Sequence, residues 1–490
     1  MSQHSTIAVR RRDVIRAAAG GLAVGSTGLA MTAVIAEAYE GEHRYIVLAD
    51  SRSRPWLENS GFDVLNSLAD DSVFIVTGPP DRQADLARVP GVQHAARDVE
   101  LRLDETLNGF AEPITPQSDS EGDSPLFWNF QWEKQVIDIE GAHERATGAG
   151  SRIVIVDTGI QPGHPDLSNL DEEASIAFLH GEPIVAGEPT DVQGHGTMVG
   201  GIAAAQGIGV LGTAPDAELV SIRIYTEAMT TTLIDILLAL NYAADIGADA
   251  INLSFGTFPL PPQVNASAIR GVFERMMNYV IEQGSIPIAA AGNSAANLQQ
   301  GGMWMLFTGL AGAIGASATG ADDLLTFYSN YGTNAIDIGA PGGGMVTAVK
   351  SYCGIMEFVL EGRIANPGED TQVCFADPDA VFPEPVFDPD EAAVCYPCTT
   401  SEFPFPLNGI LSTGYDPSTD VYGYAWQGGT SFAAPHVAGL VALVRELDSQ
   451  LNPRRVENAI KRAAENAVGR SDPALGAGRI NAASTLELLG

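Results

Sequence analysis

Gly-Thr-Ser-Phe-Ala-Ala-Pro-His-Val-Ala-Gly, residues 429–439, joins a glycine turn to an apolar helix that the hydrophobic spacing predicts over 431–447. Ser431 lies where this helix begins. Its hydroxyl is therefore close to backbone N–H groups that have no partner within the helix and can bind developing negative charge. Pro435 is expected in the first turn, where a missing N–H costs little. Gly-Thr-Ser is also an ordinary helix N-cap, so this stretch alone assigns no function.

Two segments upstream carry the other side chains that a serine nucleophile needs. Ile-Val-Ile-Val-Asp-Thr-Gly at residues 153–159 is a buried-strand pattern that ends on the carboxylate of Asp157. Gly-His-Gly-Thr at residues 194–197 opens an apolar helix with the imidazole of His195. A hydroxyl becomes a strong nucleophile when a histidine takes its proton and a carboxylate orients that histidine. The three segments together predict an Asp–His–Ser catalytic set.

Strands and helices alternate from about residue 126 onward. Apolar runs without polar alternation are typical of strands buried on both faces of a parallel sheet. Asp157 and Asn293 each follow such a strand, and open α/β sheets place their sites at these carboxyl ends. The sequence therefore predicts a three-layer α/β domain with a mainly parallel central sheet. The expected strands are 153–156, 219–224, 250–253 and 286–290, and the expected helices are 195–205, 232–246, 268–283 and 431–447.

These motifs resemble those of the subtilisin-like serine proteases, the subtilases, over about Trp128 to Leu489. The acidic composition is similar to that of the halolysin type. The resemblance implies a serine endopeptidase with protein or peptide substrates, in which Asp157, His195 and Ser431 form the triad and no cofactor is needed for the chemistry. It also implies that the Asn293 side chain and the Ser431 backbone N–H bind the oxyanion of the tetrahedral intermediate. From the residues alone, Gly-Asn after a strand is equally typical of a turn.

The resemblance further implies a substrate site that pairs with an extended peptide. Asn-Leu-Ser-Phe-Gly at residues 252–256 is similar to the family segment that pairs with bound peptide and walls the primary pocket. Backbone pairing makes few demands on the sequence of the substrate, so broad specificity is expected. The residues assigned to substrate binding are Ser254, Phe255, Gly256, Ala291 and Gly292.

A calcium site is one of two interpretations of Asp166. His-Pro-Asp-Leu at residues 164–167 matches a family motif whose aspartate binds calcium in some relatives. The facing loop, residues 205–210, lacks the usual asparagine ligand. The sequence therefore leaves open a structural calcium ligand and a solvated turn carboxylate at this position.

The charge balance is strongly acidic. The chain of 490 residues has 61 acidic and 26 basic residues, a net charge of −35, and its only lysines are Lys134, Lys350 and Lys461. Such a surface repels nucleic acid and anionic membranes, which argues against either as a partner. The small number of lysines favours adaptation to high salt. At an ionic strength of 1 M, the repulsion between surface charges is screened within about 3 Å.

The N-terminus has the pattern of an export signal. Arg-Arg-Asp-Val-Ile-Arg at residues 11–16 is a twin-arginine pattern, and an apolar, glycine-containing run over 17–35 follows it. Ala-Glu-Ala at 36–38 supplies small residues for cleavage. The alternative is a membrane-spanning helix. We expect residues 1–38 to be removed, leaving a secreted monomer without a stable membrane span, because no other stretch is long and apolar enough.

Residues 39–104 are predicted to form a separate α+β unit. Strands are expected at 44–48 and 73–76, with helices at 61–69 and 82–89. The pattern resembles the subtilase propeptide, which assists folding and inhibits the protease as a bound partner. Residues 105–125 are rich in proline, serine and acids, and are predicted to be an exposed processing linker before the catalytic domain, 126–490.

An acidic segment, residues 351–425, interrupts the α/β pattern. It contains thirteen acidic residues, one arginine and every cysteine of the chain. Two disulfides are expected in an exported protein, with three possible connectivities. A metal site is the alternative, although a zinc ribbon needs two Cys-x-x-Cys pairs and only one is present. The cysteines are Cys353, Cys374, Cys395 and Cys398.

Two other function classes fit parts of the pattern. A subtilase fold that has lost catalysis would be a binding module, which the complete set of triad and oxyanion residues disfavours. A serine-carboxyl peptidase would use a Glu–Asp pair in place of histidine, and the intact Gly-His-Gly at 194–196 counts against it. A secreted serine endopeptidase, made as a self-processing zymogen, is the function that the sequence predicts.

Overall fold

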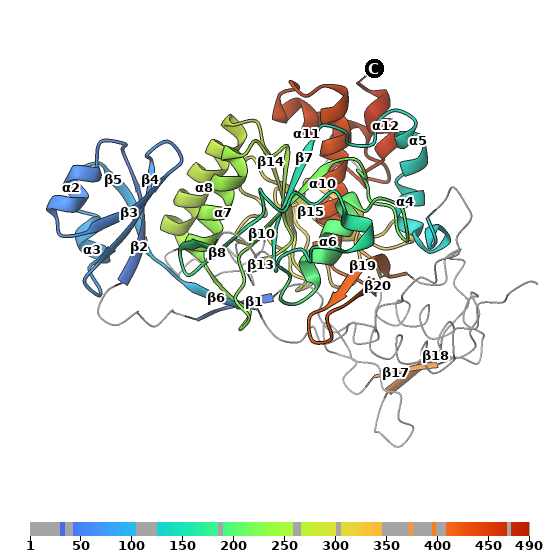
Figure 1. The fold of residues 1–490 in the computed structure, drawn as a ribbon, viewed down its shortest axis with the longest axis horizontal. Helices are drawn as coiled ribbons and strands as arrows, with labels where there is room; N and C mark the ends of the chain where they lie inside the picture. Colours follow the sequence, from blue (N-terminus) through green and yellow to red (C-terminus); the bar gives the residue numbers. More distant parts are fainter. Residues whose placement is uncertain are drawn as a thin grey trace, which may run out of the picture.

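The computed structural model of the chain shows a large α/β unit and a small N-terminal sheet packed on its side (Figure 1). In Figure 1 the small blue sheet lies at the left, beside the helices α7 and α8 of the large unit. The structure describes residues 30–34, 43–103, 125–184, 190–257, 266–299, 305–344, 372–375, 394–397, 408–467 and 472–489.

An eight-stranded sheet forms the centre of the large unit. Its strand order is β16-β15-β14-β12-β7-β10-β8-β9, and every neighbouring pair is parallel except β8 with β9 at the edge. Asp157 is the last residue of β7, which lies between β12 and β10. The strands are β7 (Arg152–Asp157), β8 (Ile176–Leu179), β9 (Glu182–Ile184), β10 (Glu218–Arg223), β12 (Ala250–Leu253), β14 (Ile286–Ala290), β15 (Ile314–Thr319) and β16 (Ile338–Pro341).

Helices cover both faces of this sheet, which confirms the predicted three-layer α/β fold. One apolar core joins one face to α6 and α10, and a second joins the other face to α7 and α8. The four helices match the ranges predicted from hydrophobic spacing. They are α6 (His195–Ala204), α7 (Leu233–Asp245), α8 (Ala266–Glu282) and α10 (Thr430–Leu447).

Helix α10 begins one residue earlier than predicted, and the placement of Pro435 in its first turn is wrong. Pro435 is the sixth residue of the helix, where a backbone N–H would normally donate to the carbonyl of Ser431. The carbonyl that proline leaves free accepts a hydrogen bond from the Ser254 hydroxyl instead, at 2.6 Å. The proline therefore opens a contact between the start of α10 and the segment after β12.

The N-terminal unit is an antiparallel sheet in the order β3-β4-β2-β5, with two short helices on one face. Alternate residues of β2 point to opposite faces: Tyr45 and Val47 pack with the helices, whereas Ile46 and Leu48 join the core under α7 and α8. The strands predicted at 44–48 and 73–76 are confirmed. The elements are β2 (His43–Ala49), α2 (Arg54–Asn59), β3 (Asp63–Leu68), β4 (Val73–Gly78), α3 (Gln83–Leu86) and β5 (Val92–Arg97).

The helix predicted over 61–69 is wrong, because Asp63–Leu68 is strand β3. The register of β3 against β4 shifts between Val64 and Asn66, so Leu65 is an extra residue in the strand and is half exposed. Such a bulge interrupts the alternation of apolar and polar residues along the strand. The apolar residues are then spaced as they would be in a helix.

A second small sheet connects the N-terminal unit to the large unit in the order β11-β6-β1-β13. Strand β6 (Glu100–Leu103) pairs antiparallel with both β11 (Thr230–Thr232) and β1 (Ala30–Val34), and β1 pairs parallel with β13 (Gly256–Thr257). An extended segment of the chain itself thus pairs with the edge that begins at Gly256.

The acidic segment predicted over 351–425 ends in regular structure. Strands β19 (Ile410–Asp416) and β20 (Val421–Gln427) form an antiparallel hairpin, and Ile410, Leu411 and Tyr424 belong to the core with α6. Strands β17 (Gln372–Phe375) and β18 (Val394–Pro397) pair with Cys374 opposite Cys395 in the register. Cys353 and Cys398 lie outside the described residues, and the disulfides stay a prediction.

Short elements complete the large unit. None of the helices in the described ranges combines the length and apolarity needed to cross a membrane. The export signal predicted over 1–38 lies outside the described residues except for β1. The remaining elements are η1 (Trp128–Phe130), α4 (Trp132–Val136), α5 (Ile139–His143), η2 (Pro165–Leu167), α11 (Pro453–Ala463) and α12 (Ala482–Glu487).

Candidate active site

Asp157 and His195 form a buried hydrogen-bonded pair at the carboxyl end of β7. The Asp157 Oδ1 lies 2.7 Å from the Nδ1 of His195, and the two side chains are 0% and 4% exposed. The same oxygen accepts the backbone N–H of Thr158 at 2.7 Å. Because Nδ1 faces a carboxylate, the ring carries its proton there and leaves Nε2 as a base. Nε2 is buried and has no hydrogen-bond partner among the described residues.

Close backbone contact brings these two residues together. Gly194, with φ of +100°, turns the chain into α6 immediately before His195. A Cβ on Gly196 would lie 2.0 Å from the carbonyl oxygen of Gly159, so only glycine lets the first turn of α6 touch the loop after β7.

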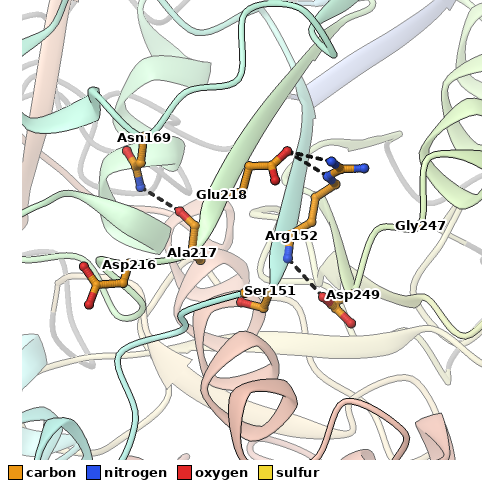
Figure 2. Close-up of a pocket in the computed structure, with 9 residues that line it drawn as sticks. Ser151, Arg152, Asn169, Asp216, Ala217, Glu218, Gly247 and Asp249 are labelled. Atoms are coloured by element: carbon orange, nitrogen blue, oxygen red, sulfur yellow. Dashed lines mark hydrogen bonds and ion pairs between the residues drawn. The ribbon is translucent and has the colours of Figure 1, made fainter.

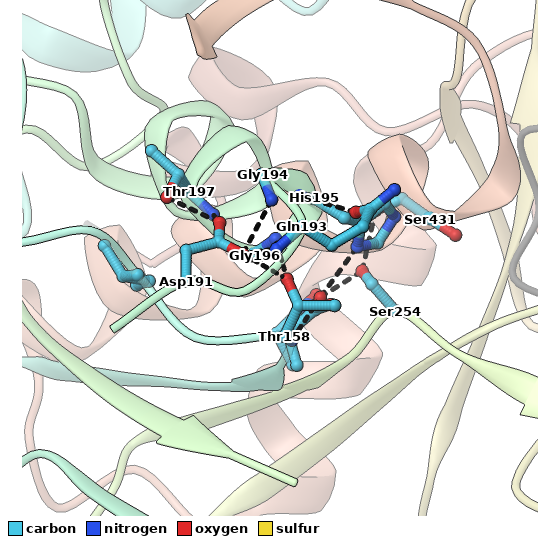
Figure 3. Close-up of polar contacts among 12 residues, drawn as sticks. Thr158, Asp191, Gln193, Gly194, His195, Gly196, Thr197, Ser254 and Ser431 are labelled. Carbon is cyan, nitrogen blue, oxygen red and sulfur yellow. Dashed lines mark hydrogen bonds and ion pairs between the residues drawn. The ribbon is translucent and has the colours of Figure 1, made fainter. Parts of the chain in front are cut away.

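Three consecutive residues of α10 connect Ser431 to the rest of the site. Thr430 donates from its backbone N and its hydroxyl to the Asn293 Oδ1, both at 2.8 Å. The carbonyl of Ser431 accepts the Ser254 hydroxyl. The ring of Phe432 packs on the ring of His195 with centroids 5.4 Å apart. Figure 3 shows Ser431, Ser254 and His195 in one cluster, in which Ser431 is 2% exposed.

Asn293 keeps one donor unused. Its oxygen accepts hydrogen bonds from Thr430, which fixes the orientation of the amide. Its nitrogen, Nδ2, is buried and has no hydrogen-bond partner among the described residues. A buried, unpaired donor is costly unless a ligand uses it. Asn330, which sequence reasoning missed, holds the loop: its oxygen accepts the N–H groups of Ser294 and Ala296, and its nitrogen donates to Ala291.

Replacing Asn293 with aspartate is expected to lower kcat about 10²- to 10³-fold, with little change in KM. Aspartate keeps the acceptor for Thr430 but substitutes a second acceptor for the Nδ2 donor. Loss of the corresponding donor in subtilisin has an effect of this size. Steady-state kinetics on a peptide amide measure it.

Asn297→Asp is the matched control, because Asn297 lies in the same loop and uses its oxygen only to bind the Gln299 N–H. A kcat for Asn293→Asp within tenfold of the control would contradict the role of Nδ2.

Two of the residues assigned to substrate binding, Ser254 and Gly292, contact the start of α10, and the side chains of Ser254 and Phe255 are used within the protein. Ser254 donates to Ser431 and accepts from Asn252, and Phe255 is 1% exposed and packs on Phe307. These two positions can therefore meet a substrate only through their backbone. Gly292, with φ of +93°, donates its N–H to the Thr430 hydroxyl.

Asp166 is a structural carboxylate, and neither interpretation of it from the sequence is correct. It is fully buried, with one oxygen bound by the Ile208 N–H and the other by the N–H groups of Gly209 and Val210 and the Tyr424 hydroxyl. Burial and the Asp166 charge raise the pKa of Tyr424, so this hydroxyl stays a donor. Four donors aimed at one carboxylate do not fit a bound cation, and we assign no calcium to Asp166.

A cavity of about 410 Å³ lies at the opposite, amino-terminal edge of the sheet (Figure 2). Several of its polar groups are already paired: Arg152 binds Glu218 and Asp249, and Asn169 donates to Ala217. It is remote from Asp157, which ends the same strand that Arg152 begins, so it takes no part in the site described here.

His436 packs on its own helix. It is fully buried and its Nδ1 donates to the carbonyl of Phe432 at 2.8 Å. Burial, followed by repulsion from Lys134, lowers the pKa of His436 well below its usual value, so the ring is neutral. It supports the turn that carries Phe432.

Comparison with known proteins agrees with this geometry. The sequence model of the subtilase family matches residues 148–478, a range that includes Asp157, His195, Asn293 and Ser431. The chain is 32% identical over 223 residues to thermitase from Thermoactinomyces vulgaris, covering 44% of this chain and 72% of that protein. It is 33% identical over 240 residues to subtilisin Savinase from Lederbergia lenta, covering 48% and 80%.

A solved structure shows the same fold at lower identity. The epidermin leader peptide processing serine protease EpiP from Staphylococcus aureus superposes with a TM-score of 0.65 and 19% identity, covering 92% of this chain and 99% of that one.

Proposed function

This chain belongs to the subtilase family and is a serine endopeptidase, and on that premise we propose that Ser431 is its nucleophile, His195 its general base and Asp157 the carboxylate that orients the base. The observation that carries the assignment is the pair of buried, unpartnered groups beside the start of α10. One is a base, the Nε2 of His195, and the other is a donor, the Nδ2 of Asn293.

Each group has a defined part in peptide hydrolysis. The Ser431 oxygen attacks the carbonyl carbon while its proton moves to His195 Nε2. The oxyanion accepts hydrogen bonds from Asn293 Nδ2 and the Ser431 backbone N–H. The intermediate collapses to an ester on Ser431 as His195 returns the proton to the leaving amine. His195 then takes a proton from a water, whose oxygen attacks the ester carbonyl, and returns that proton to the Ser431 oxygen as the acid leaves.

Covalent labelling tests this assignment. A fluorophosphonate should attach to Ser431 of the processed protein, identified by peptide mass spectrometry, and labelling should be lost in His195→Ala. Absence of labelling in processed protein would instead favour a binding module. In this proposal an extended substrate pairs with the edge at Gly256, and the pairing of β1 with β13 supports it, because that edge already accepts an extended segment.

The protein is made as a zymogen in this proposal, with residues 39–104 as inhibitor and residues 105–125 as the processing linker. Its support is the packing of the N-terminal sheet on α7 and α8, where Ile46, Leu48 and Ile75 join the core of the large unit. Purified precursor incubated in concentrated salt should cleave itself, and N-terminal sequencing should find the new end within 105–125. A precursor that the fluorophosphonate labels at Ser431 but that stays intact would refute self-processing and leave the catalytic assignment unchanged.

Two buried carboxyls lie where the N-terminal unit meets α7. Asp98 accepts the Ile234 N–H at the start of α7, and its second oxygen is 3.8 Å from the Arg44 guanidinium. Burial and then the Asp235 charge raise the pKa of Asp98 to about 7, against the opposing effect of Arg44. Burial raises the pKa of Asp235 to about 6.

Docking of the N-terminal unit is expected to weaken as the pH rises from about 4 to 7. A carboxyl with a raised pKa in the docked state holds its proton more tightly there, so docking is favoured at low pH and disfavoured once the free carboxyl is charged. Ser431→Ala precursor, nicked in trans within 105–125, should dissociate about tenfold or more readily at pH 8 than at pH 5. Asp98→Asn should remove most of this difference, and equal dissociation at both values would contradict the prediction.

Export and salt adaptation complete the proposal. Residues 1–38 would direct secretion by the twin-arginine route, and changing Arg11 and Arg12 to lysine should retain the protein in the cell. The halolysin-like character is supported by the lysines in the described ranges: Lys134 is fully buried, and Lys461 is bound between Asp337 and Glu457. Full activity after dialysis into dilute buffer would refute the adaptation to salt.

A further inference from the structure

Asp191, which no sequence motif singled out, accepts five hydrogen bonds in the interior next to the catalytic pair (Figure 3). Its Oδ1 accepts from the Thr158 hydroxyl at 2.7 Å and from the backbone N–H groups of Gln193 and Gly194 at 2.9 and 2.7 Å. Its Oδ2 accepts from Thr197, at 2.9 Å from the backbone N and 2.6 Å from the hydroxyl. The residue is 3% exposed.

The direction of these bonds is fixed by the two threonines. The Thr158 hydroxyl already accepts the Gly196 N–H at 2.9 Å, and the Thr197 hydroxyl accepts the Gln161 N–H at 2.9 Å. Each hydroxyl has one hydrogen, which therefore points to Asp191. Burial raises the pKa of Asp191, yet all five groups that hydrogen-bond to it are donors, so the carboxylate form is the one that the site binds.

The network spans the gap between the two catalytic side chains. Thr158 follows Asp157 at the end of β7, whereas Gly196 and Thr197 lie in the first turn of α6 behind His195. Asp191 thus closes two chains of hydrogen bonds, Gly196–Thr158–Asp191 and Gln161–Thr197–Asp191, that run alongside the Asp157–His195 bond. The same carboxylate tethers the backbone of Gly194, the residue before His195.

We propose that Asp191 is a positioning residue, whose charge and hydrogen bonds hold Asp157 and His195 in catalytic contact and stabilise the imidazolium during the reaction. The inference rests on the proposed roles of these two residues. The titratable groups that face the network in the described structure are Asp157 on β7, His195 on α6 and Tyr415 on β19. Burial, the Asp420 contact and then the Asp191 charge raise the pKa of Tyr415 to about 12, so it is neutral at working pH.

Asp191→Asn is the first test, since it keeps the size of the side chain but places an amide donor against the donors of Thr197. The expected loss in kcat is roughly 10- to 100-fold with KM little changed, because small displacements of catalytic groups have effects of this order. The acid limb of the kcat/KM profile should move to lower pH by roughly one unit, because a negative charge near the imidazolium is lost. Rates are normalised to active sites by fluorophosphonate titration.

Asp166→Asn is the matched control. Asp166 is an equally buried carboxylate that accepts four hydrogen bonds, from the N–H groups of residues 208–210 and from the Tyr424 hydroxyl, but it contacts no catalytic group. A purely structural role for Asp191 would make the two variants alike: both would yield less folded protein, and both would keep the kcat per active site and the pH profile of wild type.

Thr158→Val and Thr158→Ser form a second pair, which keeps the test decisive if Asp191→Asn does not fold. Valine removes the hydroxyl that joins Gly196 to Asp191, and serine retains it. Valine should lower kcat about tenfold, and serine should restore most of it. Wild type that is labelled and active, together with unchanged kinetics in Thr158→Val or Asp191→Asn, overturns this inference alone. Wild type without labelling overturns the proposed function and the inference with it.

Discussion

Ser431→Ala is expected to lower kcat about 10⁶-fold and to leave the protein as full-length precursor. Removal of the equivalent nucleophile from subtilisin has an effect of this size. The reason in this chain is that Ser431 is the hydroxyl at the start of α10 in the cluster with the unpaired base of His195. Peptide binding should survive, because the Gly256 edge and the Nδ2 donor of Asn293 are untouched.

The measurement combines turnover of a peptide amide with gel analysis of processing. His195→Ala is the companion variant, and it should lose as much activity as Ser431→Ala, because either change removes the same step. The double variant should be no slower than each single one. A fall in kcat below 10³-fold for Ser431→Ala, in protein shown to be free of wild type, would disprove its role as nucleophile.

Asp157→Asn is expected to lower kcat about 10⁴-fold, as changes at this carboxylate do in related triads. Both groups that contact the Asp157 Oδ1 are donors, the ring of His195 and the N–H of Thr158. The amide oxygen of asparagine can take that place, so the geometry is largely kept while the charge is lost. The fall in rate then reports how far the charge stabilises the imidazolium.

Circular dichroism should show the Asp157→Asn variant folded, and fluorophosphonate should label it slowly. The buried Asp166 supplies the control, because Asp166→Asn changes a carboxylate that contacts no catalytic group and should lower stability without lowering kcat per active site. Equal losses of kcat in the two variants would show that Asp157 acts only through folding.

The fold was largely predictable because buried parallel strands are continuous apolar runs. Ile286–Ala290 and Ala250–Leu253 have no polar alternation that could be mistaken for another structure, except for Asn252, whose amide binds Ser254. The hairpin of β19 and β20 could not be found in this way. Prolines and acids are frequent in the sequence just before it. Its buried Ile410, Leu411 and Tyr424 share a core with α6, which lies about two hundred residues earlier in the chain.

The candidate site was predictable only where a motif marks a residue. Gly-His-Gly-Thr and Gly-Thr-Ser contain glycines, which indicate close backbone contacts. These two motifs predicted His195 and Ser431 as site residues. Asp191 and Asn330 carry no such sign, because each acts by binding backbone N–H groups that are identified only in three dimensions. An acid four residues before His195 was the single clue to Asp191. The bulge at Leu65 and the interior position of Pro435 likewise depend on partners distant in the chain.

The burial of α10 has a consequence for when the enzyme can first harm other proteins. Every residue from Thr430 to Arg445 is buried, and this helix packs on five strands of the sheet. The serine that we propose as nucleophile therefore lies on a helix whose position depends on the finished interior. We expect a copy whose interior has not consolidated, during synthesis or after heat damage, to be inert.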